Sequence, residues 1–188
     1  MSTYKLVFVV GSLRQGSYNQ ILAKAAAKLF PDGFEIEFVE IGDLPLFNQD
    51  KEKEANVAVQ KFKQSIQKAD AVVFFTPEYN RSVPGVLKNA LDVGSRPYGE
   101  SVWTGKPAVI GGVSTGSIGT AVAQSHLRST LAFFNMPVMG QPELYFQYHD
   151  GMFDENHQII NEGTKKFVQN WVNSCVEWVR KMTTANSL

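Results

Sequence analysis

This chain lacks the cysteine pairs, the excess of charge and the long apolar runs that mark several common classes of protein. Its 188 residues include one cysteine, Cys175, so no disulfide can form within the chain. The 18 basic and 18 acidic side chains balance, which argues against a nucleic acid or an acidic membrane held by bulk charge. No apolar run approaches the roughly 20 residues of a membrane span, and the stretch before the first predicted strand is too short for a signal peptide. We therefore expect a cytoplasmic protein without a membrane partner.

The chain also lacks the residue patterns of several catalytic sites. Its three histidines, His126, His149 and His157, form no cluster with cysteine or carboxylates at metal-ligand spacing, so we expect no metal. Ser12 does not lie in the Gly-x-Ser-x-Gly elbow that is typical of serine hydrolases. We therefore nominate no catalytic side chain.

What the chain does have is a regular alternation of apolar and helical runs. The predicted strands cover residues 5–10, 35–39, 71–76 and 108–113, with a weaker signal from 138–139 to 145–146. The predicted helices cover residues 19–30, 55–68, 84–93, 119–134 and 162–181. Residues 6–10, 71–75 and 108–113 within these strands are continuously apolar, as parallel strands covered on both faces are. This alternation predicts a doubly wound α/β sheet in a single domain, residues 1–188.

Residues 11–19 connect the first apolar strand to a helix and are suited to hold a phosphate. Backbone N–H groups at a helix start and the helix dipole both favour an anion. Ser12, Ser17 and Asn19 can add hydrogen bonds, and Arg14 can add a charged fork. An ordinary strand-to-helix turn with a serine cap is the alternative.

Two related phosphate motifs do not match this loop. Gly11 and Gly16 have the spacing of a P-loop, but the Lys-Ser/Thr pair that should follow is missing. Leu13 interrupts the Gly-x-Gly-x-x-Gly fingerprint of dinucleotide-binding proteins. A terminal phosphate monoester therefore fits the loop better than a bridging pyrophosphate.

Two further polar loops follow predicted strands. In residues 76–85, Pro84 suits the first turn of the next helix, with Ser82 or Val83 at its cap. Residues 114–119 hold two glycines and three hydroxyls, so a planar ring could lie close to the backbone. In doubly wound sheets, ligands bind beyond the carboxyl ends of the strands, where these loops begin. We expect a flat heterocycle there, although each loop alone could equally be a tight turn.

The segments Gly-Ser-Leu-Arg-Gln-Gly-Ser-Tyr-Asn (11–19) and Thr-Pro-Glu-Tyr-Asn-Arg-Ser-Val-Pro-Gly-Val-Leu-Lys-Asn-Ala-Leu-Asp (76–92) resemble the signatures of the NADPH-dependent FMN reductase family. The resemblance spans roughly residues 4–180. It implies a flavodoxin-like, five-stranded parallel sheet of order 2-1-3-4-5 with helices on both faces. It also implies an FMN-dependent oxidoreductase that takes a hydride from NADPH or NADH. Electrons would then pass, in a ping-pong scheme, to quinones, chromate, azo dyes or free flavin.

The resemblance also implies which residues contact the flavin. Those that match the family's cofactor-binding pattern are Ser12, Arg14, Ser17 and Asn19 at the FMN phosphate, Tyr18 in the same loop, Pro77, Glu78, Tyr79 and Asn80 around the isoalloxazine, and Ser114, Thr115 and Gly116 in a third loop. Members often carry an aromatic residue where this chain has Arg81. Arg81 and Ser82 are therefore candidate contacts of the acceptor or of the NADPH 2′-phosphate, with a solvated arginine or a subunit salt bridge as the alternative.

The resemblance also bears on the oligomeric state, and two alternative functions stay open. Family members form dimers or tetramers, so we expect a homodimer or homotetramer, with Trp103, Phe133 and Phe134 among the aromatic residues available for an interface. A flavodoxin-type electron carrier would share the fold and FMN, but such carriers are usually strongly acidic and this chain is neutral. A phosphate-ester enzyme without flavin is the third reading.

Overall fold

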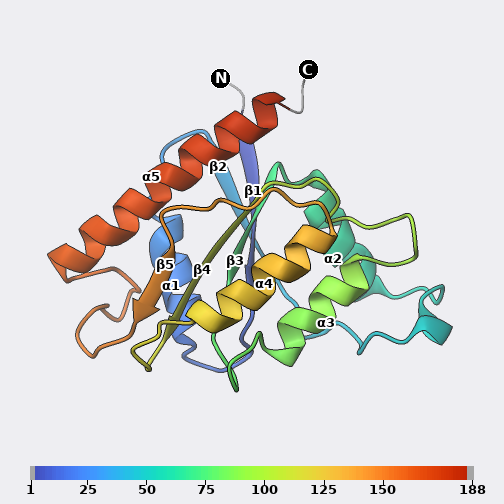
Figure 1. Ribbon diagram of the computed structural model, residues 1–188, viewed down its shortest axis with the longest axis horizontal. Coiled ribbons are helices and arrows are strands. Elements are labelled where there is room, and N and C mark those ends of the chain that lie inside the picture. Colours follow the sequence, from blue (N-terminus) through green and yellow to red (C-terminus); the bar gives the residue numbers. More distant parts are fainter. Residues whose placement is uncertain (1–2, 186–188) are drawn as a thin grey trace.

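The computed structural model describes residues 3–185, which form a five-stranded sheet flanked by helices (Figure 1). Its strands are β1 (Tyr4–Val10), β2 (Phe34–Val39), β3 (Ala71–Phe75), β4 (Ala108–Ser114) and β5 (Leu144–Gln147). Its helices are α1 (Tyr18–Ala27), α2 (Val57–Lys68), α3 (Gly85–Gly94), α4 (Ala121–Phe133) and α5 (Glu162–Ala185), with a short 3-10 helix, η1 (Gln49–Lys51). All neighbouring strands pair in parallel, in the order β2-β1-β3-β4-β5, which confirms the predicted topology.

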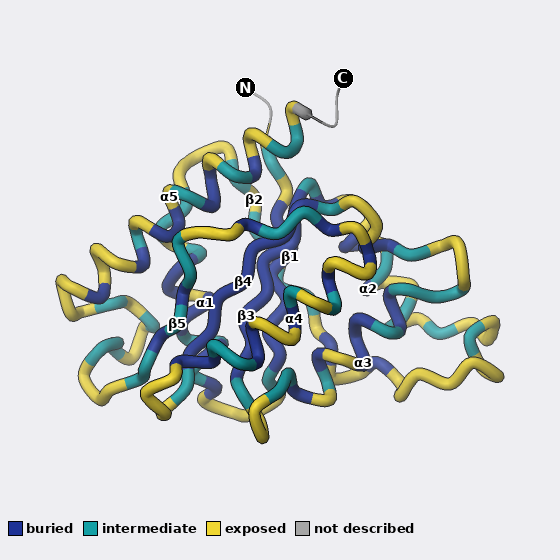
Figure 2. Tube along the Cα trace, in the orientation of Figure 1, coloured by how far each residue is buried: buried dark blue, intermediate teal, exposed yellow. Residues whose placement is uncertain are grey.

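The sheet is covered on both faces, which explains the continuous apolar runs. Successive side chains of a strand point to opposite faces. Leu6 and Phe8 pack in a cluster with α1 and α5, whereas Val7 and Val9 pack in a second cluster with α2, α3 and α4. Figure 2 shows the central strands buried and the outer faces of the helices exposed. Both clusters hold the strands rigidly, so the loops at their ends start from fixed positions.

The fifth strand is shorter than the sequence predicts. β5 begins only at Leu144, while Val138 forms a single bridge to Ala108 at the start of β4. Pro137 and Pro142 bracket the intervening turn, and proline has no N–H to donate to a ladder. The weaker sequence signal therefore splits into one isolated bridge and one short edge strand.

The start of α3 also differs from the prediction. Pro84 has extended backbone, with φ −61° and ψ 146°, and is the N-cap, so the helix begins at Gly85. The proline ring offers no acceptor, and this cap has no side-chain hydrogen bond. The Pro84 carbonyl still accepts the N–H groups of Leu87 and Lys88. We expected Ser82 or Val83 at the cap, but both precede it, and Ser82 belongs to the preceding hairpin.

The two ends of the sheet have different neighbours. The loops after β1, β3 and β4 gather at the carboxyl edge, whereas the N-terminal end of β1 and the C-terminal end of α5 lie at the opposite edge (Figure 1). At that opposite edge Asp70 and Pro107, which precede β3 and β4, line a hollow together with Thr183 of α5. No helix between residues 3 and 185 is long and apolar enough to cross a membrane.

Candidate functional site

The three predicted loops meet around two adjoining hollows at the carboxyl edge. One, of about 160 Å³, is lined by Ser12, Arg14, Ser17, Tyr18, Asn19, Pro77, Glu78, Tyr79, Val113, Ser114 and Thr115. The other, of about 350 Å³, is lined by Glu78, Asn80, Arg81, Ser114, Thr115, Gly116, Ser117 and Ile118. Every site residue predicted from the sequence lines one of these hollows, except Ser82. Segments far apart in the chain are therefore brought to one place.

A glycine in β4 shows how closely the strand ends approach one another at this edge. A Cβ added to Gly112 would collide with the Thr76 carbonyl oxygen and with the Thr120 hydroxyl. Only a residue without a side chain therefore fits between the end of β3 and the start of α4. This contact sets the spacing between the second and third loops.

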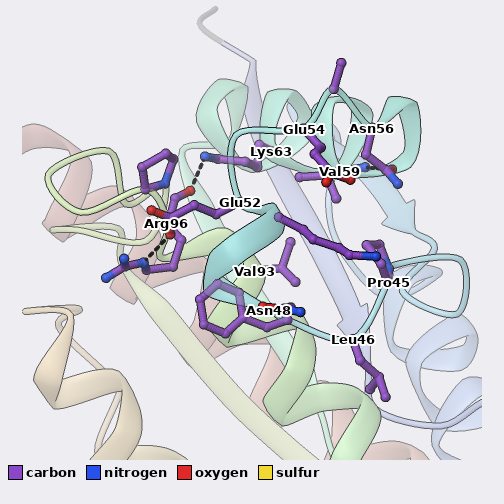
Figure 3. Close-up of a pocket in the computed structure, with 14 residues that line it drawn as sticks. Pro45, Leu46, Asn48, Glu52, Glu54, Asn56, Val59, Lys63, Val93 and Arg96 are labelled. Atoms are coloured by element: carbon purple, nitrogen blue, oxygen red, sulfur yellow. Dashed lines mark hydrogen bonds and ion pairs between the residues drawn. The ribbon is translucent and has the colours of Figure 1, made fainter.

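Another hollow lies away from these loops. Figure 3 shows it between the segment that follows β2 and the helices α2 and α3, with a volume of about 260 Å³. Arg96 and Glu52 form an ion pair of 2.8 Å at its wall, and Lys63 donates a hydrogen bond to the Arg96 carbonyl. The hollow contains none of the residues predicted to bind a ligand, so the candidate site is the carboxyl edge.

The first loop presents a free cation at the start of α1. Gly16, with φ +68°, turns the chain into the helix, and the Ser17 hydroxyl caps it by accepting the Gln20 N–H at 3.3 Å. The Arg14 guanidinium lies 5.0 Å from the centre of the Tyr18 ring. Within residues 3–185, Arg14 has no carboxylate partner. Its charge, together with the unpaired N–H groups of the first helical turn, is available to an anion.

Asn19 has a second role that we did not predict. Its side chain is buried, donating to the Val113 carbonyl at 2.8 Å and accepting the Val113 N–H at 3.0 Å. Both polar ends of the amide are thus occupied by β4. The side chain joins the first loop to the third, and its contact with a phosphate stays a prediction.

The second loop is a tight hairpin. Tyr79 and Ser82 exchange two backbone hydrogen bonds of 3.0 Å, and between them Asn80 and Arg81 have φ values of 51° and 63°. Two central residues with positive φ are typical of a type I′ turn. Asparagine tolerates this conformation well, whereas an arginine there is uncommon.

Glu78 joins this hairpin to α4. One carboxylate oxygen accepts the N–H groups of Val122 and Ala123, both at 3.1 Å, and the other pairs with Arg81 at 3.1 Å. The N-cap residue of α4, Thr120, makes no side-chain cap hydrogen bond, so Glu78 supplies the acceptor. Its side chain is only 8% exposed. We missed this role because 44 residues separate the carboxylate from the helix that it caps.

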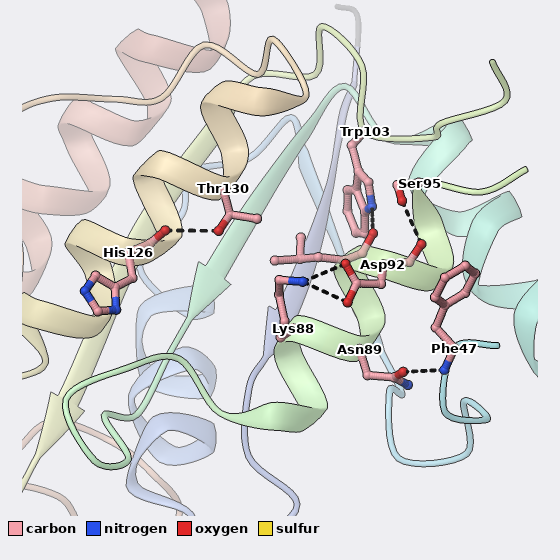
Figure 4. A network of polar contacts seen from close by, with 9 residues as sticks. Phe47, Lys88, Asn89, Asp92, Ser95, Trp103, His126 and Thr130 are labelled. Carbon is pink, nitrogen blue, oxygen red and sulfur yellow. Dashed lines mark hydrogen bonds and ion pairs between the residues drawn. The ribbon is translucent and has the colours of Figure 1, made fainter. Parts of the chain in front are cut away.

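A second contact ties the hairpin to the same helix. The Ser82 hydroxyl lies 3.1 Å from Nδ1 of His126 on α4, which explains why Ser82 is absent from the lining of both hollows. Figure 4 shows His126 and Thr130 on α4, and on the separate helix α3 the ion pair of Lys88 with Asp92 at 2.8 Å. Throughout the described chain, no group of three or more His, Cys, Asp or Glu side chains could hold a metal ion.

The end of β5 supports the third loop, a contribution that we also missed. The Tyr148 N–H donates to the Ser114 carbonyl at 2.8 Å, and the Gln147 side chain donates to the Thr115 carbonyl at 3.2 Å. The Tyr148 ring also stacks on Tyr18, with ring centres 3.8 Å apart and planes inclined by 25°. No local motif marks Tyr148. Only the predicted strand order, which places β5 beside β4, points to this segment.

These donors fit a phosphate-bearing, planar cofactor. A free guanidinium, hydroxyls and helix N–H groups lie at one end of the hollows, as a phosphate monoester requires. The hairpin and the small third loop lie at the other end and leave open space beside backbone groups. The residues present therefore fit FMN.

Comparisons with known proteins agree with this fit. A model of the NADPH-dependent FMN reductase family matches residues 4–150. A 2-hydroxy-1,4-benzoquinone reductase from Burkholderia is 49% identical over 176 residues, covering 94% of this chain and 96% of that protein. A quinone reductase from Pseudomonas putida is 47% identical over 178 residues, covering 94% and 95%. The solved structure of FerB, a flavoenzyme NAD(P)H:(acceptor) oxidoreductase from Paracoccus denitrificans, has a TM-score of 0.92 and 40% identity, covering 96% and 99%. The chain therefore belongs to the NADPH-dependent FMN reductase family, whose members are oxidoreductases that use FMN and NAD(P)H.

Proposed function

We propose that this chain is a single-domain, FMN-dependent oxidoreductase that transfers electrons from NAD(P)H to quinones. The observation that carries the proposal is the meeting of the three loops around one open region, with the unpaired Arg14 at its phosphate end. The quinone reductases among the relatives support a quinone as the acceptor. Chromate, azo dyes and free flavin belong to the same proposal, because an open hollow admits electron-poor molecules of many shapes.

In this proposal the protein binds and orients, and FMN supplies the hydride and electron transfer chemistry. Ser12, Arg14 and the first turn of α1, which line the smaller hollow, would hold the phosphate. Pro77–Asn80 and residues 114–116, which line the two hollows, would border the ring. Because the donor and the acceptor would use the same open side, they bind in turn, which is a ping-pong scheme. No side chain has to move a proton.

Arg81 and Ser82 have different parts in the proposal. The Arg81 side chain is 66% exposed beside the larger hollow, and its pairing with Glu78 leaves most of its N–H donors free. It is placed to meet an anionic acceptor or the 2′-phosphate of NADPH. Ser82 contributes indirectly, because its hydroxyl faces His126.

We further propose that the protein is a homodimer or homotetramer. Trp103 and Phe134 are buried within the chain, so they offer nothing to an interface. Phe133 on α4 is 83% exposed, and Tyr98 is 91% exposed. Aromatic side chains of this kind are enriched at interfaces. Light scattering measures the assembly directly, and a strict monomer would contradict this part.

An absorption spectrum of the purified protein, followed by anaerobic titration with NADPH, tests the proposed function. We expect a flavin spectrum that bleaches as NADPH is added, and steady NADPH oxidation when menadione is present. A flavodoxin-type carrier would hold FMN but would not oxidise NADPH by itself. A colourless protein that does not take up added FMN would rule out both.

A further inference from the structure

The orientation of Arg14 depends on an aromatic ring. Its guanidinium lies over Tyr18, at 5.0 Å from the ring centre, and has no carboxylate partner in the described part of the chain. A ring face attracts the cation without neutralising its charge. Arg14 can therefore be held in place and still attract an anion, provided that Tyr18 itself is held.

Tyr18 is held by Tyr148. The centres of the two rings are 3.8 Å apart, although the residues are distant in the sequence: Tyr18 begins α1, and Tyr148 follows β5. The backbone of Tyr148 is fixed by its hydrogen bond to the Ser114 carbonyl. Desolvation, together with the charge of the Asp150 carboxylate, raises the pKa of Tyr148. Tyr148 thus contacts the first loop through its ring and the third loop through its backbone.

We propose that Tyr148 is a positioning residue for the phosphate end of the bound flavin, acting through Tyr18 on Arg14. The inference rests on the proposed function. Arginine has many rotamers, and ordering it at the moment of binding costs entropy. A ring stack that orders Arg14 beforehand lowers that cost and tightens binding.

This role has a specific signature. Riboflavin carries the same ring system as FMN but no phosphate. A residue that acts through Arg14 therefore affects the affinity for FMN and leaves the affinity for riboflavin almost unchanged. A residue that merely supports the fold, or the ring end of the site, affects both flavins alike.

The test compares Tyr148→Ala, Tyr148→Phe and the parent as apoproteins, with Leu46→Ala as the control because Leu46 is 84% exposed and lines neither of the two hollows at the carboxyl edge. Flavin fluorescence gives the dissociation constants for FMN and for riboflavin. We expect Tyr148→Ala to weaken FMN binding about tenfold and riboflavin binding less than about twofold. Tyr148→Phe keeps the ring and should stay within about twofold of the parent for both. If Tyr148→Ala does not fold, Tyr148→Leu carries the same comparison.

A double-mutant cycle tests whether Tyr148 acts on FMN binding through Arg14. In an Arg14→Ala background, Tyr148→Ala should weaken FMN binding far less than it does in the parent. Equal losses for the two flavins, an unchanged FMN affinity in Tyr148→Ala, or full additivity with Arg14→Ala would each overturn the inference while leaving FMN binding by the parent intact. A parent that binds no FMN would instead overturn the proposed function, and the inference with it.

Discussion

Arg14 lies at the end of the site where we propose that the phosphate binds. Arg14 is exposed and lies over Tyr18 without a carboxylate beside it. The chain has equal numbers of acidic and basic side chains. The lack of a carboxylate beside Arg14 is therefore a local arrangement and does not reflect an excess of positive charge. Such a cation is suited to anchoring, because it stands at the start of α1, where the N–H groups of the first helical turn also favour an anion.

We expect Arg14→Ala to weaken FMN binding by about tenfold or more, because a charge-assisted contact to the phosphate is lost. The turnover of enzyme saturated with FMN should change by less than about twofold, since the anchor is remote from the ring. Arg14→Lys keeps the charge but loses the planar guanidinium, so its affinity for FMN should lie between those of Arg14→Ala and the parent. Equal FMN affinities in Arg14→Ala and the parent would contradict the assignment.

A second prediction concerns Arg81 and the choice between NADPH and NADH as electron donor. If its guanidinium meets the 2′-phosphate, Arg81→Ala should lower kcat/KM for NADPH about tenfold and leave NADH almost unchanged. Parallel assays with both nucleotides and one quinone measure the ratio. If the ratio of kcat/KM for NADPH to that for NADH does not change, Arg81 does not contact the 2′-phosphate. A changed KM for anionic quinones in the same variant would then favour the acceptor role.

At the scale of elements, the apolar patterns predicted what the helices and strands are, and contacts across the chain decided where they end. The apolar runs of β1, β3 and β4, each separated from the next by a helical run, were sufficient to predict a parallel sheet. The break between Val138 and β5 depends on prolines flanking one turn. The roles of Asn19 and Glu78 depend on partners at least 44 residues away, which no local pattern encodes.

The cap of α4 can be tested by removing its acceptor. Glu78→Ala should lower the free energy of unfolding by about 2 kcal/mol, because two helix N–H groups lose their partner in a partly buried position. Glu78→Gln keeps a carbonyl acceptor and should cost less. Urea denaturation of the apoproteins measures both. The matched control is Glu155→Ala, because the Glu155 carboxylate is exposed and forms no ion pair within residues 3–185. If Glu78→Ala is as stable as this control, the cap contributes nothing.

The link between α1 and β4 should be stronger. Asn19→Ala leaves both the N–H and the carbonyl of Val113 without their side-chain partner in a buried position. We expect a loss of about 3 kcal/mol in the free energy of unfolding. Asn170→Ala, on the exposed side of α5, should change stability by less than about 0.5 kcal/mol. A small effect at Asn19 would mean that water replaces the amide.

At the scale of the whole molecule, two apolar clusters share one sheet, and the single thiol lies inside one of them. Cys175 of α5 is buried in the cluster that also holds α1, and burial raises its pKa well above the ordinary value. The thiolate is the nucleophile that attacks thiol reagents, so the native protein should be unreactive even at mildly alkaline pH. Labelling then requires opening of the fold.

We therefore predict that FMN slows the labelling of Cys175. If exposure of the thiol requires the same unfolding that releases the cofactor, FMN at 100 times its dissociation constant should slow labelling about 100-fold. A disulfide reagent at fixed pH, with and without FMN, measures the rates. A labelling rate that is the same with and without FMN would show that α5 detaches while the cofactor site stays folded.

The opposed edges of the sheet have a practical meaning for an electron-transfer protein. The start of β1 and the end of α5 both lie at the edge away from the three loops (Figure 1). A tether attached through either end of the chain therefore turns the open hollows outward. On a conducting surface or a resin, every molecule would present the same side to dissolved quinones, so immobilisation should preserve access without any change to the loops.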